Sequence, residues 1–479
     1  MPQQASSQAP TVADPKRLPL VIEPENRDDS TGKDAKLING YVEKNDKTGE
    51  YWVFKRPGLL QTGATKSGNG YGVYNWNGNI YSICGTTLYK DGTSIGTVDG
   101  TGGVYKFSSS LGSTPRLQLG NAVKAYNWDN STLVQMSGVN FPGNSYADAV
   151  VKGFAYLDGS TYVLDVKAYI HGSDVVAGLN RPDLWTDATN LLGAQIEPDR
   201  GVCLAKQLVY VLALKEWSTE VFYDQQNITA SPLGPVQGAK INYGCISADS
   251  VQEIDGTLFW LATNRSSSVQ VLMLENLKAT IVSNKAIERL LGEADFTSVA
   301  SFGIKDEGHR FYGFTLKNNN ITLVYDMTDK MWAQWTDLSG NYFKIVSTTY
   351  KSNTGRILQH ETNGKLYLMD ANYFSDDGDV ITVDLYTPNY DGGVRRRKQM
   401  TMMEFIGDQT PGSKFQVRTN DFDYDSTRWT NFRMVDMGVR KPTLTNNGTF
   451  MRRATHIRHQ SNTRMRLQAI ELQLDIGTL

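Results

Sequence analysis

The chain has 479 residues and a formal net charge of -2, with 44 glycines, 24 tyrosines and only 20% charged residues. This length allows two or three ordinary domains, or one large β domain with an appendage. The charge balance excludes a chain that is basic throughout and coats nucleic acid, and the composition favours short strands joined by turns over helices.

The cysteines and the N-terminus bear on where the protein is made. Cys84, Cys203 and Cys245 are scattered and odd in number, which indicates neither a disulfide framework nor a zinc cluster. Residues 1–16 lack the apolar core of a signal peptide, and no apolar run reaches the length of a membrane span. We therefore expect synthesis in a reducing compartment, no use of the secretory route and no membrane insertion.

The N-terminal region divides into two parts. Residues 1–35 are rich in Gln, Ser, Pro, Asp and Lys and contain too few large apolar residues for a core, so they are predicted to form an extended arm. Residues 36–65 contain two strand-like runs and the turn dipeptide Pro57-Gly58. We expect these strands to pack with the C-terminal domain, because chain ends often lie close together.

Residues 66–375 repeat one pattern, a meander of short strands joined by turn residues such as Asn77-Gly78. The pattern is clearest in residues 250–291, where three strand-like runs precede a short helix with Asn284 as its N-cap. A meander of this size leaves an apolar face that it cannot bury alone, so it needs similar neighbours. Repeating units of about 40 to 55 residues predict an all-β fold with a β-propeller of about six blades, and a pair of irregular β-sandwiches is the alternative.

The sequence pattern changes after Phe374. Asp376, Asp377 and Asp379 are interpreted as a solvated acidic loop that ends the propeller. Residues 376–479 then contain further strand-like runs, and the last run alternates apolar and polar residues as a half-buried strand does. We predict that this region, together with the N-terminal strands, forms a β-sandwich platform domain.

The C-terminal region also carries the strongest charge feature. From Arg395 to the end, 15 Lys and Arg stand against 8 Asp and Glu. This asymmetry predicts an interface with a subunit or an acidic partner, while contact with phosphates and a solvated strand edge protected by charge are the alternatives. The candidate interface residues are Arg395, Arg396, Arg397, Lys398, Arg452, Arg453, Arg458, Arg464 and Arg466.

Neither a catalytic site nor a metal site is predicted. Asp421, Asp423 and Asp425 lack the glycine and glutamate of an EF-hand and are interpreted as a solvated hairpin tip. The histidines are isolated except for His456 and His459, whereas zinc needs three or four converging ligands. Because no nucleophile motif or local carboxylate pair marks a hydrolase, we expect no enzymatic activity, no cofactor and no metal.

Several segments, taken in order, resemble a known family: the tail nozzle or hub proteins of short-tailed phages, in the form of the packaged-DNA stabilisation protein. The resemblance covers residues 37 to 479, and each motif is weak by itself. The segments are residues 37–43 leading to Arg56-Pro57-Gly58-Leu59, residues 218–224, residues 281–291 with Ala286-Ile287-Glu288, and the Arg-rich final strands.

The resemblance implies a structural virion protein of the phage tail, made in the host cytoplasm and without catalytic residues. It implies a homo-hexameric ring below the portal and adaptor that continues the DNA channel, retains the packaged DNA and takes part in genome ejection. The implied partners are portal and adaptor proteins, a tail needle, plug or fibre protein, and double-stranded DNA in transit. A carbohydrate-binding or glycan-hydrolysing β-propeller is the competing hypothesis, and an interaction propeller inside a cell is a third.

Overall fold

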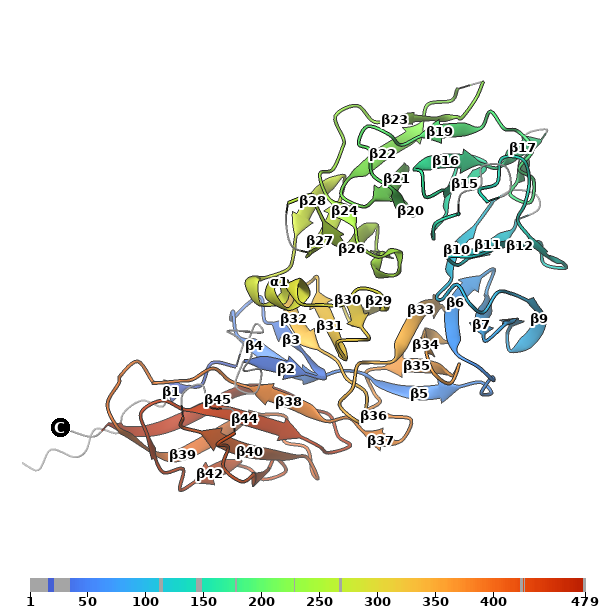
Figure 1. Ribbon diagram of the computed structural model, residues 1–479. Coiled ribbons are helices and arrows are strands. Elements are labelled where there is room, and N and C mark those ends of the chain that lie inside the picture. The colour runs from blue at the N-terminus through green and yellow to red at the C-terminus, as the bar shows by residue number, and fades with distance from the viewer. Residues whose placement is uncertain are drawn as a thin grey trace, which may run out of the picture. The chain divides into compact units, whose positions relative to one another are not determined.

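The structure is a computed structural model that describes residues 16–20, 35–111, 115–143, 149–176, 179–227, 229–266, 269–422, 425 and 427–476. Strands dominate these residues, with one α-helix, α1 (Lys285–Gly292), and one 3-10 helix, η1 (Ala248–Ser250) (Figure 1). The all-β prediction is confirmed. No helix in the described part of the chain is long and apolar enough to cross a membrane.

The chain forms two compact units. We call the unit of residues 58–330 and 335–373 the propeller, and the unit of residues 1–57, 331–334 and 374–479 the platform. The sequence predicts that residues 36–65 all pack with the platform, whereas the structure divides them between the two units after Pro57. The reason is β5 (Gly58–Thr62), which pairs antiparallel with β35 (Leu366–Asp370) of the propeller.

The propeller is built from antiparallel meanders. Five of its sheets contain only strands that follow one another along the chain, and a sixth begins with three such strands. The first sheet contains β6 (Gly70–Trp76), β7 (Asn79–Cys84), β8 (Thr87–Lys90) and β9 (Thr93–Thr97), and the second contains β10 (Lys106–Ser109), β11 (Leu117–Gly120), β12 (Ala125–Trp128) and β13 (Leu133–Gln135). The third contains β14 (Ala155–Leu157), β15 (Ser160–Leu164), β16 (Tyr169–Gly172) and β19 (Leu191–Gly193). A small hairpin of β17 (Asp174–Val176) and β18 (Leu179–Arg181) is inserted before β19.

The next three sheets consist of β20 (Gly201–Gln207), β21 (Tyr210–Lys215), β22 (Thr219–Asp224) and β23 (Leu233–Pro235); β24 (Gly244–Cys245), β25 (Gln252–Ile254), β26 (Thr257–Thr263), β27 (Gln270–Glu275) and β28 (Lys278–Ile281); and β29 (Val299–Asp306), β30 (His309–Leu316) and β31 (Ile321–Asp326). A closing sheet contains β33 (Ile345–Lys351), β34 (Gly355–His360) and β35, with β5 next to β35.

The sheets close into a ring. Neighbouring sheets contact one another in chain order, and β33 of the closing sheet contacts β6 of the first. Each sheet buries its apolar faces against the sheets on either side, and Leu212 and Leu258, for example, belong to one apolar cluster shared by two neighbouring sheets. The predicted β-propeller of about six blades is confirmed, with seven sheets formed by the described residues in the ring, and β5 pairs with β35 in the closing sheet.

Local predictions inside the propeller are also confirmed. Asn77 and Gly78 have φ values of 50° and 76°, the left-handed conformations that a tight two-residue hairpin turn between β6 and β7 requires. The side chain of Asn284 accepts a hydrogen bond from the backbone N–H of Ile287 at 3.0 Å, as an N-cap does. Helix α1 follows and buries Ile287 and Leu291.

The platform contains two packed sheets, and its core combines Val53 and Leu472 of one sheet with Leu385 and Ile457 of the other. One sheet has the order β3 (Gly40–Lys44), β4 (Tyr51–Lys55), β45 (Arg466–Ile476), β39 (Lys398–Gly407) and β42 (Thr443–Thr445), with β43 (Thr449–Phe450) on β39. The other contains β32 (Met331–Gln334), β2 (Lys36–Ile38), β38 (Val383–Tyr386), β44 (Ala454–His459), β40 (Lys414–Asn420) and β41 (Arg433–Asp436). The short strands β36 (Ser375–Asp376) and β37 (Asp379–Val380) form a hairpin in this unit.

Part of the predicted N-terminal arm is docked on the platform. β1 (Lys16–Arg17) pairs with β45, and Leu18 and Leu20 are buried in the platform core. The rest of the arm, residues 1–15 and 21–34, lies outside the described residues. The two leucines explain the docking, because even a short apolar segment gains free energy when an adjacent sheet edge and core accept it.

Candidate functional site

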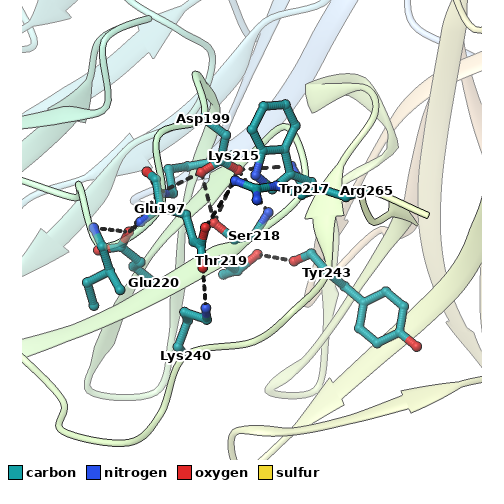
Figure 2. Close-up of polar contacts among 11 residues, drawn as sticks. Glu197, Asp199, Lys215, Trp217, Ser218, Thr219, Glu220, Lys240, Tyr243 and Arg265 are labelled. Carbon is teal, nitrogen blue, oxygen red and sulfur yellow. Dashed lines mark hydrogen bonds and ion pairs between the residues drawn. The ribbon is translucent and has the colours of Figure 1, made fainter. Parts of the chain in front are cut away.

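A buried carboxylate pair lies in the propeller, where Asp199 and Glu220 both bind Lys215 (Figure 2). The Lys215 Nζ atom is 2.8 Å from Asp199 Oδ1 and 2.6 Å from Glu220 Oε1, and none of the three side chains is more than 2% exposed. Lys215 is the last residue of β21 and Glu220 is the second residue of β22, so adjacent antiparallel strands bring them together. Asp199 comes from the connection before β20.

The remaining bonds of this cluster are also made inside the protein. Lys215 donates a third hydrogen bond to the carbonyl oxygen of Glu197 at 2.9 Å. Asp199 Oδ2 accepts from the backbone N–H groups of Trp217 and Ser218, both at 2.9 Å. Carboxylate pairs hydrolyse glycosides only where they face a substrate, whereas this pair faces a lysine in a sealed position. The arrangement therefore stabilises the sheet and offers no place for a substrate.

The rim of the cluster links the same connection to later loops (Figure 2). Glu197 binds Lys240 at 2.6 Å and Arg265 at 3.1 Å, and the Arg265 guanidinium lies 5.0 Å from the centre of the Trp217 ring. The hydrogen bond from Lys240 holds the pKa of the Glu197 carboxyl below its usual value. Lys240 lies in the connection between β23 and β24, and Arg265 lies in the connection between β26 and β27, so this rim fastens two successive sheets.

Two cavities are lined by the inner strands of the propeller, with volumes of about 430 and 310 Å³. Lys106 lines the larger one and donates a hydrogen bond to the carbonyl oxygen of Val251 at 2.8 Å. Lys152 lines the smaller one and binds Asp249 at 2.7 Å. Volumes of this size suit small molecules. A DNA duplex is far wider, since its major groove by itself accommodates an α-helix. The interior of a single propeller therefore cannot serve as a duplex channel.

The predicted basic interface residues differ in their surroundings. Arg395, Arg396 and Arg397 are exposed, and within the described residues none of them forms an ion pair. Lys398 is buried and donates its amino group to the carbonyl oxygens of Val394 and Arg396. Burial lowers the pKa of Lys398. The run of four basic residues therefore offers three side chains to a partner.

The other predicted basic residues have partners within the platform. Their acidic partners lie on different strands or loops, which local sequence does not reveal. The ion pairs are Arg453 with Asp421 at 2.6 Å, Arg458 with Asp384 at 2.7 Å, and Arg466 with Asp408 at 2.7 Å. Arg464 lies 3.9 Å from the same Asp408, and Arg452 is half-buried.

Two of the predicted solvated acidic groups are engaged in the platform. Asp421 binds Arg453, while Asp423 lies outside the described residues. The solvated interpretation is wrong for Asp376, which is only 9% exposed and accepts two bonds from Arg56, at 3.0 and 2.5 Å. Arg56 is the residue before Pro57, where the chain leaves the platform, and Asp376 follows its return at Phe374. This ion pair therefore joins the outgoing and the returning segments.

Three of the five histidines, His171, His309 and His456, make hydrogen bonds to carboxylates, and one of these three lies in a cluster of possible metal ligands. His309, Asp326 and Asp329 bring one ligand atom each within 4.8 Å of one another. His309 Nδ1 is 2.6 Å from Asp326 Oδ2, a hydrogen-bond distance, so this contact already engages the ring nitrogen that a metal would need. His456 makes a similar contact of 2.6 Å with Asp384.

The fold defines the chain as a closed β-propeller joined in sequence to a β-sandwich unit. A family model described as "Bacteriophage P22 Gp10, beta-propeller" matches residues 40–372, more than two thirds of the chain. The chain therefore belongs to this phage stabilisation family, whose members are phage structural proteins. The matched region runs from β3 of the platform through the closing sheet of the propeller.

Comparison with solved structures gives distant similarities. The computationally designed protein Ika8 is 10% identical, with 65% of this chain and 98% of that chain covered and a TM-score of 0.35. The extracellular domain of the putative hybrid two component system BT4673 from B. thetaiotaomicron is 9% identical, with 90% and 62% covered and a TM-score of 0.40. YCF48 bound to D1 peptide is 12% identical, with 69% and 100% covered and a TM-score of 0.38. No curated protein sequence matches the chain.

Proposed function

We propose that the protein is a tail nozzle or hub protein of a short-tailed phage, in which six copies form a ring below the portal and adaptor. The ring continues the DNA channel, retains the packaged genome and takes part in its ejection, and a needle, plug or fibre protein closes it. The match of the phage stabilisation family over residues 40–372 carries this proposal. In this role the protein is structural and has no enzymatic activity.

The dimensions of the propeller favour a channel made by several copies. The cavities of about 430 and 310 Å³ are far smaller than a duplex needs, and Lys106 and the Lys152–Asp249 pair fill the space beside them. A protein of this shape can surround DNA only by placing several copies around it. Closed point-group symmetry is the usual solution for such assemblies.

The platform supplies a surface for stacking against another ring. Arg395, Arg396 and Arg397 project without an ion pair among the described residues, so an acidic surface on the adaptor would find three cations already exposed. Charge complementarity of this kind fixes the register between stacked rings and speeds their association.

Native mass measurement tests the proposal. The purified chain is measured alone and after mixing with its adaptor, and a species of six times the 53.3 kDa chain mass is expected in the mixture. The competing carbohydrate propeller predicts a monomer that binds or cleaves glycans. A chain that stays monomeric with adaptor and hydrolyses a glycan in a turnover assay would refute the nozzle proposal.

A further inference from the structure

The larger propeller cavity has an unusual set of charges. It has a volume of about 430 Å³, and residues of β6, β10, β14, β20, β25 and β33 line it. Its charged lining residues are Lys106, Lys206 and Glu253, so the lining carries an excess of one positive charge. A cavity of this volume lies within the range of small-molecule sites, about 300 to 1,000 Å³.

Both lysines make a hydrogen bond to a backbone carbonyl and lack an ion pair. Lys106 Nζ donates to Val251 O at 2.8 Å, and Lys206 Nζ donates to Tyr156 O at 2.6 Å. Among the described residues, no carboxylate oxygen lies within 4.0 Å of either amino group. Burial lowers the pKa of both lysines, and the more distant carboxylates of Asp249 and Glu253 oppose this shift only in part.

The smaller cavity provides an internal comparison. Its two lysines are each paired with a carboxylate, Lys152 with Asp249 at 2.7 Å and Lys317 with Glu361 at 2.5 Å. The same fold therefore pairs the cations of one cavity directly with carboxylates and leaves those of the other without an ion pair within 4.0 Å. A partly buried cation without a direct ion pair is poorly stabilised, and an anion that enters the cavity supplies the missing contact.

The lining also offers neutral donors for oxygen atoms. The hydroxyl-bearing residues Ser108 and Ser109 follow Lys106 along β10 and line the same cavity. Glu253 of β25 opposes an anion: the residue as a whole is exposed, but its carboxyl lies among cavity residues, and the loss of solvent there raises its pKa. Two amino groups and two hydroxyl groups against one carboxylate favour a small anion with several oxygens.

We propose that this cavity binds a small oxyanion, a phosphate or a carboxylate group, through the amino groups of Lys106 and Lys206. The anion completes the ion pairs that the cavity lacks, and the serine hydroxyls orient its oxygens. This site is independent of the assembly proposed above, because it lies within one propeller and needs no second copy.

Binding of inorganic phosphate and of acetate to the full-length chain tests this site. Melting temperature and calorimetric titration are measured at pH 7, with chloride at equal ionic strength as the reference. Phosphate or acetate is expected to raise the melting temperature above that in chloride, and the anion with the tighter binding identifies the preferred group. Equal melting temperatures in all three salts would overturn the proposal.

Charge variants locate the binding. Lys106→Met and Lys206→Met are each expected to weaken binding at least about tenfold, since each removes a charge-assisted bond. Glu253→Gln is expected to strengthen it, because the opposing carboxylate is lost. Lys305→Met, at an exposed lysine that binds Asp255, is the matched control and is expected to leave binding unchanged. If Lys106→Met is unstable, an unchanged affinity in both Lys206→Met and Glu253→Gln overturns the site.

Discussion

The propeller and the platform stabilise buried cations in different ways. In the propeller, Lys215 presents a compact ammonium group to two carboxylates and a carbonyl from three directions. In the platform, Arg56 presents a planar guanidinium to both oxygens of Asp376. A lysine is a compact charge that single acceptors can approach from several directions, whereas the planar arginine fork matches both oxygens of one carboxylate. The two clusters therefore differ in geometry: Lys215 makes single contacts with two carboxylates, and Arg56 makes paired contacts with one.

Substitution of the propeller cation tests this comparison most strongly. Lys215→Met leaves Asp199 and Glu220 buried without a counter-charge, and breaking a buried ion pair in this way costs about 3 to 5 kcal/mol. The free energy of unfolding is measured by urea titration. Lys240→Met is the matched control at a half-exposed lysine, with an expected loss under about 1 kcal/mol. Equal losses of unfolding free energy in the two variants would mean that the buried cluster stabilises the fold no more than an exposed ion pair does.

The platform cation is tested by a substitution that keeps its charge. Arg56→Lys retains one positive charge but loses the two parallel bonds to Asp376, and its side chain does not reach Asn39 Oδ1 in the way that Arg56 Nε does at 3.1 Å. We expect a loss of about 2 to 3 kcal/mol in the free energy of unfolding. Urea titration followed by limited proteolysis of the platform measures it. Wild-type stability in this variant would show that charge alone is sufficient there.

Acid sharpens the comparison through one buried histidine in each unit. Burial lowers the pKa of His459 in the platform to about 3 and that of His360 in the propeller to about 4. The unfolded chain binds a proton at each histidine near pH 6.5, whereas the folded chain does not until the pH falls to these values. Stability therefore decreases as the pH falls from about 6.5 toward 4 and 3, by at most about 1.4 kcal/mol per pH unit for each histidine.

Urea titrations at pH 7 and pH 4.5 measure this dependence. His459→Asn is expected to reduce the loss of platform stability between these two values, because Asn does not titrate, and His360→Asn does the same for the propeller. A loss that is unchanged in both variants would assign the acid sensitivity to the paired carboxylates instead.

Much of the fold could be predicted because the turns carry local signals. Asn77-Gly78 and the cap at Asn284 fix the direction of the chain over a few residues. The inner strands β29 and β33 are not evident from the sequence. In β33, apolar and polar residues do not alternate, because the hydroxyl groups of Ser347 and Thr349 accept hydrogen bonds from the backbone of β6. The role of β5 could not be predicted either, since its partner β35 lies some three hundred residues further along the chain.

The candidate sites were harder to predict than the fold. Counting charges identifies an excess of basic residues after Arg395, but it does not show that Asp384 and Asp408 neutralise Arg458 and Arg466. The sequence does not indicate that Lys215 is buried, because a lysine at the end of an apolar strand is typical of the start of an exposed turn. The pairs Arg458–Asp384 and Arg466–Asp408 join residues that are separated in the sequence by other strands, and only the fold brings them together.

The smallest expected effect on stability is at the exposed arginines of the platform. The triple variant Arg395→Ala, Arg396→Ala and Arg397→Ala removes side chains that have no ion pair among the described residues, so the free energy of unfolding should change by less than about 0.5 kcal/mol.

If these arginines contact an acidic adaptor, the same variant weakens association, and salt weakens wild-type association in the same way. Binding is measured by calorimetry at low and moderate salt. Arg458→Ala is the control, because its partner Asp384 is inside the platform, so it should reduce stability and leave association intact. The reverse pattern would move the interface away from residues 395–397 and assign them to the solvated strand edge.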